Sequence, residues 1–258
     1  MDVKVVKKKG MYTFVVEGIT PAFANSLRRL MMGEVPTLAV EHADFHENTS
    51  VLFDEMIAHR LGMIPLRFDA GVMNFRTECT CEGAGCPLCQ TVFALEKTGP
   101  CMVTSGDLKS TNKDVHPTSP DFPIVELMAH QRLKLDAFAC LGRGREHAKY
   151  QAAIASYQYY PSLVVEGEVE SAKRVLDTFP EGMLKAEGKK LSLTDPLTAS
   201  LDPVYNDGKV KVWVDGDPTA LIFRVESICG RETEDIILTA AKVLQEKAEE
   251  FKKAVGEL

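Results

Sequence analysis

The sequence predicts an α+β fold, and three observations support this prediction. Short runs of alternating apolar residues, such as 131–141, are typical of strands. A Thr20-Pro21 pair precedes a segment with apolar residues on one face, which predicts a capped N-terminal helix. Residues 231–255 repeat apolar residues at spacings of three and four, which predicts a long C-terminal helix.

The N-terminal region predicts strands on both sides of this first helix. Residues 3–17 predict two short strands around a Lys-Gly turn. The helix that Thr20 caps should end before Pro36, because proline lacks the backbone N–H that a helix interior needs. A strand is predicted over 37–45, followed by a turn at Glu47-Asn48.

The middle of the chain predicts a second helix and further strands. Residues 53–62 show a helical pattern that Gly62 and Pro65 close. The sequence then predicts a loop, a strand, a Pro-rich loop and another strand, at 66–89, 91–96, 116–123 and 131–141.

Residues 163–202 differ in composition from the rest. They predict a short helix ending at Pro180 and a hairpin over 183–196. Residues 209–227 predict strand structure interrupted by a Gly-Asp-Pro turn.

The C-terminal helix carries an apolar stripe. Its members are Ile237, Ala241, Leu244, Ala248, Phe251 and Val255. Lys and Glu fill the opposite face of the helix. Such a stripe packs either on the chain's own domain or on a partner, and the sequence leaves both alternatives open.

Four of the seven cysteines lie close together, at Cys79, Cys81, Cys86 and Cys89. Four thiolates can close a tetrahedral shell around zinc. Nothing in this segment suggests an open coordination position, so we expect one structural zinc, with iron as the alternative metal. The remaining cysteines are expected to be small buried hydrophobes.

Composition excludes several classes of protein. The 258 residues carry a net charge of −7, which argues against a broadly basic nucleic-acid binder. Because the sequence shows neither a secretory signal nor a membrane-spanning stretch, we expect no membrane association and a cytoplasmic location. No phosphate-binding, nucleophile or metalloprotease motif occurs, so we predict no catalytic residues.

A Gly-rich segment, 142–149, carries Arg143, Arg145 and Lys149. Guanidinium groups in such a loop can bind carboxylates of a partner with two parallel hydrogen bonds. A solvated turn is one alternative interpretation. Phosphate binding is another, less favoured because the segment has few cations and the chain is net negative.

Several ordered motifs together carry a family resemblance. They lie at 17–29, 33–39, 48–66, 104–108 and 142–151, and thus across much of the first 160 residues. The chain resembles the family of archaeal D subunits of DNA-directed RNA polymerase. This family is related to the third-largest subunit of eukaryotic polymerase II and to the bacterial alpha N-terminal domain.

The resemblance implies a discontinuous dimerisation domain of the alpha-subunit type, formed by residues 1–40 and 208–258. It implies an inserted mostly-β domain over 41–162, which includes the cysteine loop, and a small ferredoxin-like α+β insertion over 163–207. The chain would be a non-catalytic polymerase subunit that heterodimerises with subunit L. The pair would form the assembly platform for the large catalytic subunits and other small subunits, and DNA would be contacted only indirectly.

The resemblance also implies roles for individual residues. The dimer interface would comprise the C-terminal stripe together with Phe23, Leu27 and Leu30. For contacts with the large subunits, the resemblance indicates the helix that carries Arg28 and Arg29. The placement of Arg143, Arg145 and Lys149 in the Gly-rich loop adds three further expected contact residues.

The ferredoxin-like insertion departs from the family pattern. Many members carry a CxxCxxCxxxCP cluster motif there. With Phe179-Pro180 set on the final Cys-Pro, the cluster positions hold Val169, Ala172, Val175 and Phe179, which cannot bind iron. We therefore expect no iron–sulfur cluster, and a small hydrophobic core in its place.

Two other functions compete with the assembly subunit. An independent zinc-containing nucleic-acid-binding module is suggested by the cysteine loop, but a basic surface with interleaved aromatic residues is missing. A small-molecule enzyme is favoured only by the size of the chain.

Overall fold

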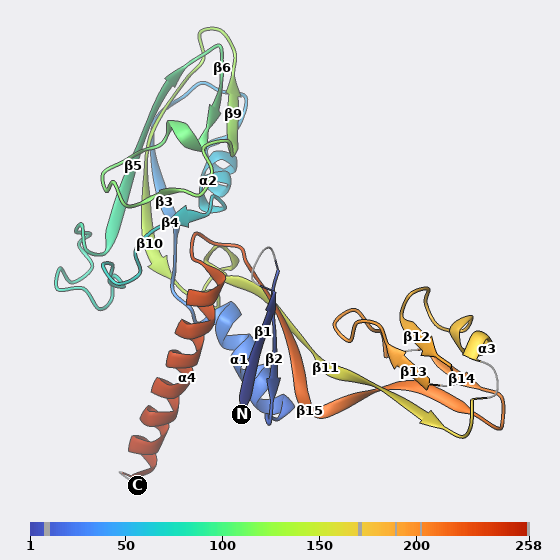
Figure 1. Ribbon diagram of the computed structural model, residues 1–258. Helices are drawn as coiled ribbons and strands as arrows, with labels where there is room; N and C mark the ends of the chain where they lie inside the picture. The colour runs from blue at the N-terminus through green and yellow to red at the C-terminus, as the bar shows by residue number, and fades with distance from the viewer. Residues whose placement is uncertain (8–10, 170–171, 189, 202, 257–258) are drawn as a thin grey trace. The chain divides into compact units, whose positions relative to one another are not determined.

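The computed structural model describes residues 1–7, 11–169, 172–188, 190–201 and 203–256 (Figure 1). The chain divides into two compact units, and each is discontinuous in sequence. The first comprises Met1–Arg28 and Ala155–Val225, and the second comprises Arg29–Ile154 and Glu226–Leu258. The mixture of helices with a larger share of strands confirms the predicted combination of α and β structure. The predicted three-part domain division stays a prediction.

The first unit is built on a five-stranded sheet. Its strands follow the order β1 (Asp2–Lys7), β2 (Tyr12–Glu17), β15 (Lys211–Ser227) and β11 (Ala153–Glu166), with β14 (Val204–Asn206) also paired to β15. The two predicted N-terminal strands are confirmed and pair antiparallel, whereas the predicted Lys-Gly turn lies outside the described residues. Phe14 stacks on Phe223 across β2 and β15, with ring centroids 5.0 Å apart.

The predicted Gly-Asp-Pro turn is wrong. Strand β15 continues through Gly216, Asp217 and Pro218, and its pairing partner changes there from β14 to β2. The backbone N–H of Thr219 donates to Asp217 Oδ1 at 2.8 Å, so a side chain satisfies this group without a reversal of the chain. The residues typical of a turn are thus present, but both halves of β15 pair with other strands, and this pairing keeps the backbone extended.

The segment predicted to be ferredoxin-like contains less regular structure than expected. The predicted hairpin is confirmed as β12 (Leu184–Glu187) and β13 (Lys190–Leu193). The predicted helix is confirmed as α3 (Ala172–Leu176). After it, the N–H groups of Thr178 and Phe179 donate to the carbonyls of Val175 and Leu176, so turns and not a continued helix lead to Pro180. Among the four cluster-equivalent positions, Val169, Val175 and Phe179 are buried in one hydrophobic cluster and Ala172 packs against it. The expected small hydrophobic core is confirmed.

Helix α1 (Pro21–Gly33) confirms the predicted N-terminal helix. The Thr20 hydroxyl accepts a hydrogen bond from the backbone N–H of Phe23 at 3.3 Å, as its predicted role of N-cap requires.

The second unit contains a four-stranded sheet and a large hydrophobic core. The sheet order is β3 (Thr37–Asn48), β10 (Arg132–Gly142), β5 (Gln90–Thr98) and β7 (Lys109–Ser110). The strands predicted at 91–96 and 131–141 are therefore confirmed. Helix α2 (Asp54–Gly62) confirms the second predicted helix and buries Ile57 and Leu61 in the core.

Two predictions for this unit need correction. The predicted turn at Glu47-Asn48 is wrong, because both residues still pair with β10 and the Glu47 carboxylate lies 3.2 Å from Arg132 Nη1. The regions predicted as loops contain two short strands, β4 (Leu66–Arg67) within 66–89 and β8 (His116–Pro117) within 116–123. Two further strands, β6 (Cys101–Thr104) and β9 (Pro123–Leu127), pair with each other and had no specific prediction of their own. Strands of two to five residues are too short to show a periodic pattern.

Helix α4 (Thr233–Gly256) confirms the predicted C-terminal helix. Its buried residues are Ile236 and Ala240, both in its first two turns. Each lies one position before a residue of the predicted stripe. Because successive helical residues are rotated by about 100°, the buried face and the stripe point in different directions.

Candidate functional site

The cysteine loop brings its four sulfur atoms together. All four ligand atoms lie within 4.8 Å of one another. The Sγ atoms of Cys79 and Cys86 are 3.5 Å apart, as are those of Cys81 and Cys89. Zinc bonded to four sulfurs at about 2.3 Å sets neighbouring sulfurs about 3.8 Å apart. The donor set and its spacing therefore fit one tetrahedral metal ion.

The backbone around these cysteines explains the arrangement. The N–H groups of Cys89 and Gln90 both donate to the carbonyl of Cys86, at 3.0 and 2.9 Å, which closes a tight turn between two ligands. Gly85 has φ +89°, a left-handed conformation that favours glycine. A Cβ atom there would also lie 2.7 Å from Gln90 Oε1.

The pKa values differ among the four thiols. A hydrogen bond from the backbone N–H of Gly85 lowers the pKa of Cys81 to about 6. Burial raises the pKa of Cys89 to about 12. A bound cation favours the thiolate form of every ligand, so a metal would hold all four sulfurs deprotonated. Its contribution here would be structural, as a cross-link of the loop.

The predicted stripe on α4 becomes more exposed toward the end of the helix. Ile237 and Leu244 are half-buried, whereas Ala241 and Ala248 are exposed. Phe251 is 72% exposed and Val255 is 51% exposed. The last turns of α4 therefore present large apolar side chains at the surface.

The predicted contact residues on α1 have different environments. Phe23 is 36% exposed, whereas Leu27 and Leu30 are buried within the chain. The Nε and Nη2 atoms of Arg28 both donate hydrogen bonds to Asn25 Oδ1, at 3.3 and 3.0 Å. Arg29 is exposed and makes no ion pair within the described part of the chain.

The predicted basic loop is partly engaged within the second unit. The Arg143 guanidinium lies 4.4 Å from the centre of the Phe75 ring. Arg145 Nη1 is 3.2 Å from Glu34 Oε1. Lys149 Nζ lies 2.7 Å from Glu41 Oε2, which also accepts a hydrogen bond from the Tyr150 hydroxyl.

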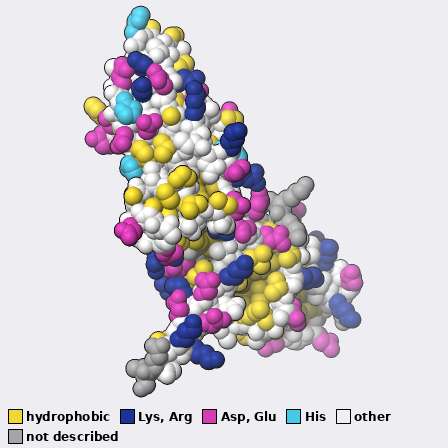
Figure 2. Space-filling view, turned by 90° about the vertical axis from the view of Figure 1, so that its left-hand side faces the viewer, with side chains coloured by type: hydrophobic (Ala, Val, Ile, Leu, Met, Phe, Trp, Pro, Cys, Tyr) yellow, Lys and Arg dark blue, Asp and Glu magenta, His cyan; other side chains and the backbone are white. Residues whose placement is uncertain are grey.

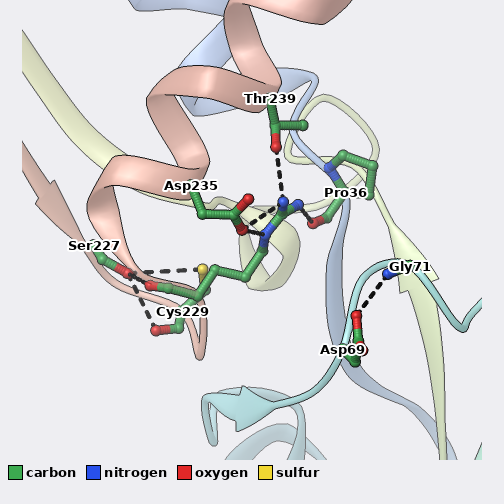
Figure 3. A network of polar contacts seen from close by, with 8 residues as sticks. Pro36, Asp69, Gly71, Ser227, Cys229, Asp235 and Thr239 are labelled. Carbon is green, nitrogen blue, oxygen red and sulfur yellow. Dashed lines mark hydrogen bonds and ion pairs between the residues drawn. The ribbon is translucent and has the colours of Figure 1, made fainter.

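Sequence reasoning missed one buried charged residue, Arg231. Its side chain is 5% exposed, and its guanidinium bonds three different residues (Figure 3). Asp235 at position i+4 was the one visible signal, since a cation and a carboxylate at this spacing pair on a helix.

One face of the molecule shows no continuous basic patch among the described residues. On the face in Figure 2, the described Lys and Arg side chains are interspersed with Asp and Glu, and hydrophobic side chains form separate patches. No helix in the described ranges is both long and apolar enough to cross a membrane.

Comparison with known proteins defines the class of protein. Residues 44–159 match the family model of the RNA polymerase Rpb3/RpoA insert domain. These residues include the cysteine loop and strands β10, β5 and β7 of the second unit's four-stranded sheet, with the end of β3.

Relatives over nearly the full length are more specific. The chain is 35% identical to DNA-directed RNA polymerase subunit Rpo3 of Pyrococcus horikoshii, over 97% of this chain and 96% of that protein. It is 33% identical to subunit Rpo3 of Archaeoglobus fulgidus, over 100% and 98% of the two chains. It is 37% identical to subunit Rpo3 of Methanosarcina acetivorans, over 92% and 91%. The chain therefore belongs to the Rpo3 family, the archaeal D subunits of DNA-directed RNA polymerase.

Family membership confirms the predicted resemblance. It also confirms that the chain is a subunit of a nucleotidyltransferase complex and is not itself catalytic.

Proposed function

We propose that this chain is an assembly subunit that heterodimerises with subunit L through the apolar stripe of α4. The pair forms the platform on which the large catalytic subunits and other small subunits assemble, and DNA is contacted only through the finished complex. We place this assembly in the cytoplasm, since four reduced thiols in one loop need a reducing compartment.

The observation that carries the proposal is the direction of the stripe on α4. The face that the helix buries within its own unit is centred on Ile236 and Ala240. The stripe lies about 100° away around the helix, so this packing half-buries Ile237 and Leu244 and leaves its other four residues exposed. Phe251 and Val255 then expose apolar area near the end of the helix. An amphipathic helix with an unused apolar face is a common element of helix-mediated dimerisation.

The dimer interface also includes the predicted residues of α1. Phe23 is exposed and available for direct contact. Leu27 and Leu30 are buried, so they would shape the helix surface from beneath.

The cysteine loop holds one structural zinc in this proposal. The four sulfurs, within 4.8 Å of one another, support the donor set. Two of the ligands, Cys79 and Cys89, are buried, and a buried thiolate requires a compensating charge. The insertion over 163–207 carries no iron–sulfur cluster, because its cluster positions are apolar.

The five basic residues contact the large subunits. Arg29 is exposed without an ion pair in the described ranges, and it can bind a partner's carboxylate with two hydrogen bonds. Arg145 is 53% exposed despite its contact with Glu34, so its guanidinium can also donate hydrogen bonds to a second carboxylate. Arg28 and Arg143 are held by Asn25 and Phe75, and Lys149 by Glu41, which fixes their positions for such contacts.

Purification with and without coexpressed subunit L tests this function. An assembly subunit should be monodisperse as a 1:1 complex and poorly soluble alone, because the stripe is then uncovered. A chain that is equally soluble and monodisperse without subunit L, and does not copurify with it, would contradict the proposal.

A further inference from the structure

The segment that leads from β15 into α4 is fixed at several points within the second unit. The backbone N–H of Ile228 donates to the carbonyl of Ala152 at 3.1 Å. Gly230 lies so close to β4 that a Cβ atom on it would be 1.8 Å from the Leu66 carbonyl oxygen. The Ser227 hydroxyl donates to the carbonyl of Arg231 at 2.7 Å. The first turn of α4 therefore starts from a closely held backbone.

Arg231 connects this start to the rest of the unit (Figure 3). Its Nε donates to Asp235 Oδ2 at 2.7 Å and its Nη2 donates to Thr239 Oγ1 at 2.8 Å, so it spans the first two turns of α4. Its Nη1 donates to the Pro36 carbonyl at 2.9 Å, in the segment between α1 and β3. One planar group thus joins a helix face to a backbone carbonyl outside the helix.

The rest of α4 has few such contacts. Its buried residues end with Ala240. Beyond Thr239, the described residues include one ion pair from α4 to the remainder of the unit, between Lys247 Nζ and Glu34 Oε2 at 3.5 Å. The direction of the exposed half is therefore set mainly at its first two turns.

The length of the helix makes this direction important. Phe251 follows Arg231 by twenty residues, which is about 30 Å along a helix, and a tilt of about 10° at the start moves the end by about 5 Å. Side chains in a packed interface do not tolerate a displacement of that size.

We propose that Arg231 is a positioning residue that holds α4 in the direction required for binding subunit L. This inference rests on the proposed function of the stripe and names the residue that directs it. Arg231 does not touch the partner, because its side chain is buried within its own unit. The guanidinium suits the role, since its rigid planar fork bonds three acceptors at fixed angles and an ammonium group does not.

The test measures the dissociation constant of the full-length chain for purified subunit L, in wild type and in variants. If α4 in R231M holds the binding direction about a tenth of the time, the apparent dissociation constant rises about tenfold. R231K keeps the charge and loses the fork, so an intermediate loss is expected. R67M is the matched control, because Arg67 pairs with Glu232 of the same segment at 2.8 Å but both side chains are exposed. Its affinity should stay within about twofold of wild type.

A second background separates positioning from general destabilisation. In a chain that carries Phe251→Asp, the far end of α4 no longer contributes to binding. Adding R231M to this chain should raise the dissociation constant for subunit L by less than about twofold, because two changes that act through one contact are not additive. Hydrogen exchange of the amides between Asp235 and Ala240 should accelerate in R231M, with the core of the insert domain unchanged.

Three results would overturn the inference. R231M could bind as tightly as wild type, its loss could be matched by R67M, or its loss could persist in full in the Phe251→Asp background. If near-UV circular dichroism shows that R231M does not fold, R231K and Thr239→Val decide by the same criteria, since both keep the buried charge beside Asp235. A wild-type chain that does not bind subunit L would instead contradict the proposed function.

Discussion

Replacing Leu244 and Phe251 by aspartate should separate the chain from subunit L without unfolding it. Phe251 is 72% exposed and Leu244 is half-buried. Burying a large apolar side chain contributes about 1.5–3 kcal/mol, so most of that amount is available at Phe251 on binding. A carboxylate buried without a partner in this apolar interface weakens the binding free energy by a further ~3–5 kcal/mol. The affinity for subunit L should therefore fall by at least about a thousandfold.

The isolated chain should tolerate the same change. An aspartate at an exposed position usually alters stability by about 0.5 kcal/mol or less, and the half-buried Leu244 adds about 1 kcal/mol. The assay is copurification of tagged subunit L, with far-UV circular dichroism of the variant as the test of folding. A double variant with aspartate at Lys242 and Lys253, on the opposite face of α4, is the control and should copurify normally. Unchanged copurification of the Leu244 and Phe251 variant would refute the interface.

Three further predictions concern the metal, the basic residues and the insertion. Elemental analysis should give about one zinc per chain, and a Cys86→Ser, Cys89→Ser double variant should lose it; a coloured iron chromophore would contradict the assignment. Arg29→Glu combined with Arg145→Glu should reduce recruitment of the large subunits to a preformed heterodimer, because it reverses charges placed for carboxylates; normal assembly with weakened DNA binding would count against it. A protein prepared without oxygen should be colourless, with no broad absorption at about 400 nm, because residues 163–207 offer no thiolates; a brown preparation that bleaches in air would show that the chain does hold a cluster.

Much of the fold follows from local sequence signals. The Thr20 cap predicted α1, and the repeat of apolar residues predicted α4 nearly to its ends. The cysteine loop was predicted from spacing, and the four sulfurs do lie together. Each of these signals spans fewer than about thirty residues, the range over which propensity and periodicity act.

Long-range contacts were not predictable from one sequence. The Arg231 guanidinium bonds the carbonyl of Pro36, 195 positions away in the chain. Gly230 is needed because the backbone of Leu66 lies against it, and no local pattern indicates that approach. The turn predicted at residues 216–218 was wrong for the same reason, since β14 and β2 keep both halves of β15 extended.

The sparse packing of the last turns of α4 has a consequence for a cell that makes the chain in excess. The second half of α4 contains no buried residue, so chiefly its backbone hydrogen bonds stabilise it. Segments of this kind unfold locally with little cost in free energy, and proteases cut them in the unfolded state. In the proposed heterodimer the partner covers this half of the helix, so paired chains are protected from proteolysis. We therefore expect unpaired copies to be degraded first, which would keep the amounts of the two subunits matched without any regulation of their synthesis.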